Sequence, residues 1–329
     1  VELERHFTFL LQQMNSRQTR REIFLALKEE DVEKLRAIAV RDDINFRCYD
    51  VDSNKDSVIH VACRLGNLST LRFLHKEIGV SLELNNAEGK RPLHEAAQCS
   101  HLDIVQYLVK EGADVNSLKR ADWTPLMLAC TKTNLEIIKY LLDHGADPKI
   151  RNKDGWNCFH VACRQGDADI VRYLLSAAPE LGKTISNNGR TPLHTAALHG
   201  QLGVVRQLIL QDPREVDHHD NCGTTALMDA ARRNSVECFE CLLKAGADAG
   251  ARDVMGRNCL HLAAQTGAQD VVTHILDMGL LPVNSTSGSG MTPTDLAVRE
   301  RQEAVADLLV RAGGKCFVEV VKISSPSYS

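Results

Sequence analysis

A short phrase recurs along this chain at a nearly constant interval, and this period constrains the fold more than any other feature of the sequence. The clearest copy is Thr191-Pro192-Leu193-His194-Thr195-Ala196-Ala197. The position held by His194 recurs at residues 60, 94, 127, 160, 194, 228, 261 and 295, so successive copies are 33 or 34 residues apart. A fixed period of this size predicts stacked repeats that contact only their neighbours. It therefore predicts one elongated unit, although a length of 329 residues alone would suggest two domains.

Each repeat has the composition of two short helices followed by a turn. Thr191 is a suitable N-cap for a helix that begins at Pro192, because the first helical turn does not use the N–H that proline lacks. A second helix with apolar residues at helical spacing follows, and turn residues then form a hairpin-like finger. The first helix is predicted to end at a residue that tolerates left-handed backbone, namely Gly66, Gly166, Gly200, Asn234 and Gly267.

The Thr-Pro-Leu-His-x-Ala phrase at this period resembles the ankyrin-repeat family. The resemblance implies an all-α ankyrin-repeat solenoid of about nine helix-turn-helix units with β-turn fingers. We expect an N-terminal helix and capping repeat with a long finger at residues 1–55, ankyrin repeats at residues 56–314 and a C-terminal tail at residues 315–329.

The two ends of the array are expected to be atypical, as terminal repeats often are. Residues 1–13 are predicted to form an extra helix, and residues 21–40 an unusual helix pair whose second helix covers residues 31–40. In the last repeat Asp295 replaces the histidine and Arg301 replaces the glycine, and residues 317–321 are predicted to add a short strand.

Composition excludes several classes of function. The net charge of −4 gives no overall basis for binding nucleic acid or membranes, and no apolar run reaches membrane-spanning length. Among the 11 cysteines, Cys63, Cys130 and Cys163 share the repeat position of Ala97 and Ala197, which indicates small buried side chains. We therefore expect a reduced compartment, the cytoplasm with the nucleus as an alternative, and a monomer that contacts neither membrane nor nucleic acid.

The sequence shows no recognisable arrangement for metal binding or catalysis. The histidines at positions 60, 94, 160, 194 and 261 occur once per repeat, and stacked helices lie roughly 8–10 Å apart, so one metal ion cannot contact two of them. An inter-repeat hydrogen bond is the favoured interpretation. Other candidates fail on spacing or context: Cys238-x-x-Cys241, the cluster of His218, His219 and Cys222, and Gly182-Lys183-Thr184, which follows a helix where a phosphate loop follows a strand. We expect no metal, no cofactor and no enzymatic activity.

One finger position is more informative. It precedes the capping residue and holds Lys90, Trp123, Trp156, Arg190, Thr224, Arg257 and Met291. Both tryptophans of the chain occur there, and lysine or arginine stands nearby at positions 119, 120 and 153. Exposed aromatic and arginine side chains are enriched at interface hot spots. The predicted partner-binding residues are therefore Lys90, Arg120, Trp123, Trp156 and Arg190; the alternative is that each tryptophan packs flat on the neighbouring finger.

Over residues 85–265 the chain resembles one member of the family more closely, a cofactor of alanyl-tRNA synthetase. The phrases that carry this resemblance are Lys90-Arg-Pro-Leu-His-Glu-Ala-Ala97, Ala121-Asp-Trp-Thr-Pro-Leu-Met127, Asn152-Lys-Asp-Gly-Trp-Asn157 and Asp220-Asn-Cys-Gly223. The resemblance implies binding to the catalytic domain of alanyl-tRNA synthetase and capture of misactivated serine on lysine side chains, which prevents serine mischarging of tRNA(Ala).

The serine-accepting lysines that this resemblance implies fall on Lys153, Lys183 and Arg120. Arg120 departs from the pattern, because a guanidinium is not a usable acyl acceptor, so the adjacent Lys119 becomes the third candidate. The competing hypothesis is a generic ankyrin adaptor that binds another protein and performs no chemistry of its own.

Overall fold

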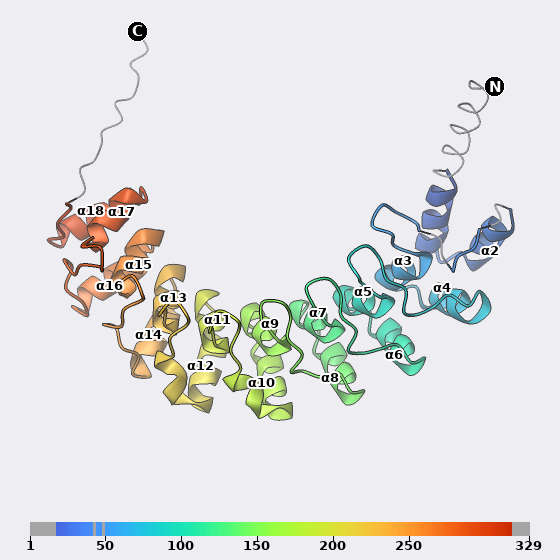
Figure 1. Ribbon diagram of the computed structural model, residues 1–329, viewed down its shortest axis with the longest axis horizontal. Coiled ribbons are helices and arrows are strands. Elements are labelled where there is room, and N and C mark those ends of the chain that lie inside the picture. The colour runs from blue at the N-terminus through green and yellow to red at the C-terminus, as the bar shows by residue number, and fades with distance from the viewer. Residues whose placement is uncertain (1–17, 42–43, 48–49, 318–329) are drawn as a thin grey trace, which may run out of the picture. The chain divides into compact units, whose positions relative to one another are not determined.

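The computed structural model describes residues 18–41, 44–47 and 50–317. Within these residues the fold is all-α, with stacked pairs of helices and no named strand (Figure 1). This confirms the predicted fold class. The chain divides into two compact units, Val1–Lys153 and Asp154–Ser329, and each is described here by itself.

The first unit begins with a helix at residues 18–28. Its further helices are α2 (Val32–Arg41), α3 (Val58–Leu65), α4 (Leu68–Arg72), α5 (Pro92–Cys99), α6 (Leu102–Lys110), α7 (Pro125–Thr131) and α8 (Leu135–Asp143). The helix α4 continues directly into a short π-helix, η1 (Phe73–Glu77). The atypical helix pair predicted for residues 21–40 is confirmed, whereas the helix predicted for residues 1–13 lies outside the described residues.

The second unit contains five further helix pairs among its described residues. They are α9 (Cys158–Gln165) with α10 (Ala168–Ala177), α11 (Pro192–Leu198) with α12 (Leu202–Gln211), α13 (Ala226–Arg233) with α14 (Val236–Lys244), α15 (Cys259–Thr266) with α16 (Gln269–Asp277), and α17 (Pro293–Arg299) with α18 (Glu303–Arg311). Two short 3-10 helices, η2 (Pro179–Lys183) and η3 (Pro213–Asp217), follow α10 and α12. Phe317 is not in a strand, and the rest of the strand predicted at residues 317–321 lies outside the described residues.

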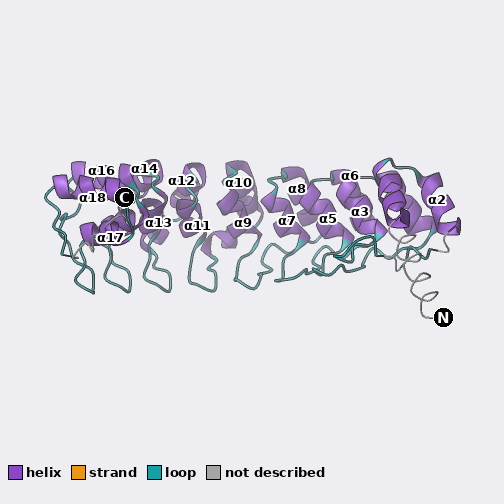
Figure 2. Cartoon of the chain, turned by 90° about the horizontal axis from the view of Figure 1, so that it is seen from above, coloured by secondary structure: helices purple, strands orange, loops and turns teal. Residues whose placement is uncertain are grey.

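In each unit the helices form two layers. The first helices of successive repeats pack on one another, as α3, α5 and α7 do in the first unit and α9, α11, α13, α15 and α17 do in the second. The second helices form the other layer. Figure 2 shows the fingers leaving each unit on the side of the first helices, away from the second helices.

The recurring phrase forms the start of the first helix as predicted. The hydroxyl of Thr191 accepts the backbone N–H of His194 at 3.4 Å, and Nδ1 of His194 accepts the N–H of Thr191 at 3.3 Å. These reciprocal bonds satisfy backbone N–H groups that a helix N-terminus leaves without intrahelical partners. In the last repeat Asp295 replaces the histidine and satisfies the same backbone group, because its carboxylate accepts the N–H of Thr292 at 2.8 Å.

The predicted helix ends are also confirmed. Gly66, Gly166, Gly200, Asn234 and Gly267 all have left-handed backbone, with φ between 61° and 90°. The small residues of the phrase line the packed interior: Cys63, Cys130 and Cys163 are fully buried, as are the alanines at the same position. A larger side chain at these positions would separate the first helices of adjacent repeats.

Candidate protein-binding surface

Buried histidines hold the fingers in place. The Nε2 atoms of four of them lie within hydrogen-bond distance of a finger carbonyl, His60 with Lys90 at 2.9 Å, His94 with Trp123 at 3.1 Å, His194 with Thr224 at 2.9 Å and His261 with Met291 at 3.2 Å. Because a carbonyl can only accept, Nε2 carries the proton. Burial lowers the pKa of His94, His194 and His261 to about 4, so these rings are neutral at neutral pH. The predicted inter-repeat hydrogen bond is thus confirmed for these four histidines.

Several fingers share one construction. At the first position a short polar side chain accepts two backbone N–H groups, as Asn86 does from Glu88 and Lys90, both at 2.9 Å. Asp220 and Asp253 act in the same way in the second unit. A glycine follows three positions later with left-handed backbone, as at Gly89, where φ is 69°.

The finger at residues 119–123 departs from this construction. Lys119 stands where the other fingers have the polar acceptor, and Asp122 stands where most of them have glycine and one has Lys55. The turn is closed by the N–H of Lys119, which donates to Trp123 at 3.0 Å, and by the N–H of Asp122, which donates to Lys119 at 2.8 Å. Ala121 and Asp122 have φ of 65° and 62°, a conformation that costs a non-glycine residue about 1 kcal/mol or more. Backbone strain of this kind is concentrated at functional sites.

The side chains of this finger form an amine–aromatic pair. The Nζ atom of Lys119 lies 5.8 Å from the ring centroid of Trp123, within the range of a cation–π interaction. Burial lowers the pKa of the Lys119 ammonium, and the charge of Lys90 lowers it further, while Glu88 and Glu95 act in the opposite direction. The finger position predicts an exposed ring for Trp123. In the structure this ring is half-buried.

Two more predicted residues lie at this finger. Arg120 is exposed, and its backbone N–H donates to Glu88 of the preceding finger at 2.8 Å. Lys153 is exposed, and its backbone N–H donates to Ala121 at 3.1 Å. The structure therefore brings Lys119, Arg120, Trp123 and Lys153 together in the first unit, and we call these four residues the finger surface.

Lys90, a further predicted contact, is engaged in ion pairs within the first unit. Its Nζ atom lies 3.4 Å from both Glu88 and Glu95. Glu95 is only 2% exposed and also accepts from Arg64 at 3.1 Å. These interactions fix the base of the finger, and a direct role of Lys90 in partner binding stays a prediction.

Trp156 and Arg190, the predicted partner-binding residues of the second unit, are also held by contacts within that unit. Trp156 is half-buried, and its ring stacks on His160 with the centroids 5.9 Å apart, so it packs on its own repeat's histidine. Arg190 pairs with Asp220 at 3.3 Å and with the buried Asp229. For both residues partner binding stays a prediction.

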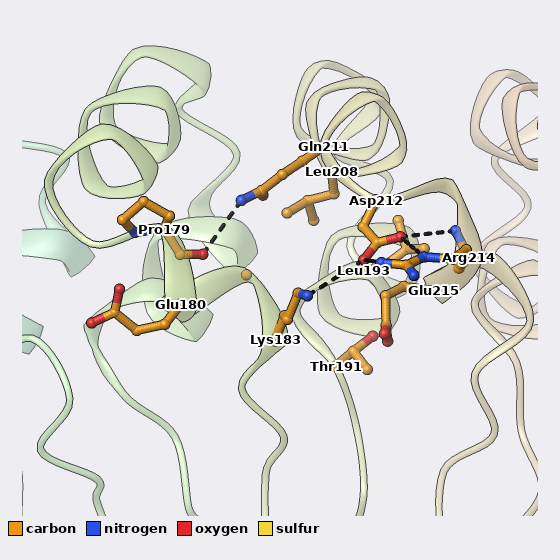
Figure 3. A pocket seen from close by; sticks show the side chains of 11 residues that line it. Pro179, Glu180, Lys183, Thr191, Leu193, Leu208, Gln211, Asp212, Arg214 and Glu215 are labelled. Carbon is orange, nitrogen blue, oxygen red and sulfur yellow. Dashed lines mark hydrogen bonds and ion pairs between the residues drawn. The ribbon is translucent and has the colours of Figure 1, made fainter.

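Lys183 lies at a cavity and not in a finger loop. The cavity has a volume of about 450 Å³ and is formed mainly by the two repeats that carry η2 and η3. Figure 3 shows the Lys183 side chain directed toward Asp212, 3.8 Å away, with Leu193 and Leu208 behind them. Arg214 donates to both carboxylate oxygens of Asp212 at 2.9 Å and lowers its pKa to about 2.

Sequence reasoning missed this cavity and the charge pairs behind the fingers. A signal for the cavity was available: where other repeats end the second helix with Gly-Ala-Asp, these two have Ala178-Pro179 and Asp212-Pro213. The buried carboxylates Glu95 and Asp229 were also visible in the pattern, since both follow the histidine position of their repeat directly.

Neither a metal site nor a membrane-spanning helix is found among the residues that the structure describes. No group of three or more histidine, cysteine, aspartate or glutamate side chains in residues 18–41, 44–47 and 50–317 is placed to hold a metal ion. None of the helices described is long and apolar enough to cross a membrane.

The sequence matches the family of ankyrin repeats (3 copies) at residues 23–119, 111–184, 126–217, 179–253, 201–283 and 227–319. The chain therefore belongs to the ankyrin-repeat family. Ankyrin repeats typically bind other proteins and are not catalytic.

Curated relatives share the repeats over part of their length. Transient receptor potential cation channel subfamily A member 1 of Drosophila melanogaster is 26% identical over 262 residues, which are 78% of this chain and 20% of that protein. Inversin of Mus musculus is 34% identical over 119 residues, 36% of this chain and 11% of inversin. Alpha-latrocrustotoxin-Lt1a of Latrodectus tredecimguttatus is 33% identical over 85 residues, 25% of this chain and 6% of the toxin. The chain thus matches a fifth or less of the length of each.

Proposed function

We propose that this protein is a scaffold that binds a partner protein through the finger surface and performs no chemistry of its own. The observation that carries the proposal is the strained turn at Ala121 and Asp122. Most other fingers have glycine at this place, and Lys55 is the one other non-glycine residue there among the described fingers. Two consecutive non-glycine residues with left-handed backbone occur in the finger of Ala121 and Asp122, where Lys119 and Trp123 form a cation–π pair. A tryptophan with adjacent cationic side chains is the composition of a binding hot spot.

The half-buried state of Trp123 supports this role. A ring that is already fixed by its neighbours loses little conformational freedom on binding, and its exposed part remains available to a partner. The chemistry of the surface favours a partner with an apolar pocket for the ring and carboxylates for Lys119, Arg120 and Lys153.

The proposal is tested with Trp123→Ala. A partner is first captured from lysate with the complete chain and identified by mass spectrometry, and its affinity is then measured with purified proteins. Truncation of a hot spot should weaken binding by about 2 kcal/mol, which is roughly thirtyfold. The matched control is Phe24→Ala, which removes another aromatic ring, 46% exposed, from the first unit. Equal affinities of the two variants would contradict the proposal.

A second candidate function is the serine-capturing cofactor of alanyl-tRNA synthetase, by resemblance to ankyrin repeat domain-containing protein 16. Besides the phrases that carry the resemblance, one observation favours it: the amine of Lys119 has a lowered pKa. A neutral amine attacks the activated carbonyl of seryl adenylate, an amide forms, AMP leaves and the amine proton passes to water. The catalytic domain of the synthetase would then be the partner, in the cytoplasm with the nucleus as an alternative.

Mass spectrometry distinguishes the two candidates. The protein is incubated with synthetase, ATP and serine, and peptides containing Lys119, Lys153 and Lys183 are examined for seryl addition. The exposed Lys244 is the internal control. Arginine at the three positions should preserve charge and synthetase binding but abolish capture. Binding without seryl addition to the parent protein would leave the scaffold function alone.

A further inference from the structure

Three successive repeats of the second unit place arginine or histidine side chains at the ends of their first helices, and the first and third of them carry the arginines. Arg164 lies in the last turn of α9, His199 is the C-cap of α11, and Arg232 and Arg233 lie in the last turn of α13. The three arginines are exposed and His199 is half-buried. These helices pack side by side, and their layer is the one from which the fingers leave (Figure 2). We call Arg164, His199, Arg232 and Arg233 the arginine ridge.

The ridge is not neutralised by its surroundings. Among the described residues, the guanidinium groups of Arg164, Arg232 and Arg233 form no ion pair with a carboxylate. Two of the nearby carboxylates are buried: Asp220 and Asp229 are 8% and 0% exposed, and both pair with Arg190. The exposed Asp270 accepts from the side chain of Asn234, which follows Arg233, at 2.8 Å. The two buried carboxylates are thus paired within the protein, whereas the three arginines of the ridge are exposed to solvent.

The first unit provides an internal comparison. Arg64 occupies the same place as Arg164, in the same phrase His-Val-Ala-Cys-Arg. Arg64 pairs with Asp56 and with Glu95 of the next repeat. The residue that corresponds to Glu95 in the repeat after Arg164 is Thr195, which has no charge to offer. Two positions therefore decide whether this arginine is paired within the protein or available to a ligand, since the counterpart of Asp56 is Trp156 and that of Glu95 is Thr195.

The positive charge of the ridge acts on the pKa of His199. Burial lowers the pKa of its imidazole, and the charges of Arg164, Arg233 and Arg190 lower it further. A favourable interaction with the helix dipole explains why cations are tolerated at helix C-termini. It does not explain why arginines occur at this place, because the first helices α5, α7 and α15 outside the ridge have no basic residue in their last turns.

We propose that the arginine ridge binds an acidic segment of a partner protein in extended conformation. Guanidinium groups pair with carboxylates in a bidentate geometry, and exposed arginines keep this capacity free. Adjacent packed helices lie roughly 8–10 Å apart, and an extended chain advances about 3.3 Å per residue, so about six residues span the two repeats from α9 to α13. A peptide with a carboxylate at every third residue therefore places one at each of these two helices. Three arginines in a chain of net charge −4 form a small cationic patch, which suits a short acidic segment better than the many phosphates of a nucleic acid.

The test uses the complete chain and a fluorescein-labelled peptide with glutamate at every third residue, separated by glycine and serine. Fluorescence anisotropy gives its affinity at low and at physiological salt. The parent protein should bind the peptide, and binding should weaken as salt rises. The same peptide with glutamine in place of glutamate should not bind.

The variant Arg164→Gln, Arg233→Gln should weaken binding roughly tenfold, since two charge-assisted contacts are lost. The matched control is Arg172→Gln, Arg206→Gln, which removes the same charge from exposed positions on α10 and α12. Both double variants should keep the circular dichroism and thermal transition of the parent, because all four arginines are exposed. An equal loss of affinity in both variants would mean that only net charge matters, and would overturn the proposal.

Three probes test other ligands on the same ridge. A peptide with phosphoserine in place of glutamate, a single-stranded RNA oligonucleotide and vesicles with anionic headgroups are measured under the same conditions. If one of them binds through Arg164 and Arg233 while the glutamate peptide does not, the ridge has another ligand and the proposal is wrong. This result is independent of the finger surface, since Trp123→Ala leaves the ridge unchanged.

Discussion

The buried carboxyl group of Asp229 should make the free energy of unfolding depend on pH. Its side chain is 0% exposed, and its Oδ2 atom pairs with Arg190, whereas Oδ1 has no hydrogen-bond partner within the described residues. Burial raises the pKa of Asp229 from an ordinary value of 3.8 to about 7, against the opposing charges of Arg190 and Arg232. The folded protein therefore holds this proton more tightly than the unfolded chain does.

The sign and the size of the effect follow from linkage. Because the folded-state pKa is raised, protonation favours the folded state, and stability falls as the pH rises from about 3.8 through about 7 and then levels off. At about 1.4 kcal/mol per pH unit, the interval between these values corresponds to about 4 kcal/mol. Of this, about 3 kcal/mol falls between about pH 5 and about pH 8.

The assay compares the parent with Asp229→Asn, which keeps the shape and removes the titration. Urea unfolding followed by circular dichroism gives the free energy of unfolding of each protein at several pH values. Taking the difference cancels the titration of all other groups. We expect the parent to lose about 3 kcal/mol relative to the variant between about pH 5 and about pH 8.

Two outcomes bear directly on the reasoning. A difference that does not change with pH, or a parent that gains stability relative to the variant as the pH rises, would show that Arg190 outweighs burial and would refute the argument. Glu237→Gln, which removes an exposed carboxylate from α14 of the same unit, controls for the loss of a negative charge as such.

Three further predictions use the same features. Asp122→Gly restores the glycine of the other fingers and should raise the free energy of unfolding by about 0.5 kcal/mol in urea titrations, because it relieves left-handed strain; a loss of stability would count against strain. Glu95→Gln should lower it by about 1–2 kcal/mol, since the buried acceptor of Arg64 loses its charge; an unchanged urea midpoint would contradict this. Thr195→Glu should pair with Arg164 and weaken binding of the glutamate peptide roughly threefold in the anisotropy assay, whereas unchanged affinity would show that Arg164 is not part of the site.

The fold was largely predictable because it depends on local rules repeated at a fixed interval. The cap at Thr191, the left-handed helix ends and the small residues of the first helices each follow from one residue type at one position. The inter-repeat bond of His194 was predictable for the same reason. Each prediction needed only the residue and its place in the period.

The binding surface was less predictable, because it depends on departures from the period. The position of Trp123 marked the finger, but its contact with Lys119 follows from a turn without glycine, and this requires the backbone angles. The lowered pKa of Lys119 depends on burial by neighbouring fingers, which a sequence pattern does not measure. The cavity at Lys183 requires two consecutive repeats with altered helix ends.

The repeat position that follows the histidine connects these departures. In the first unit this position holds Glu95, which neutralises Lys90 of its own finger and Arg64 of the preceding repeat. In the second unit it holds Thr195, so that Arg190 must reach Asp229 of the next repeat and Arg164 is left without a carboxylate. The position is buried in every one of these repeats, so its residue changes the charge of the surface without being part of it. A repeat protein can therefore acquire a binding site for a new class of ligand by substituting the side chains that neutralise an arginine, here at the positions of Asp56 and Glu95, while the exposed arginine and the helix that carries it stay the same.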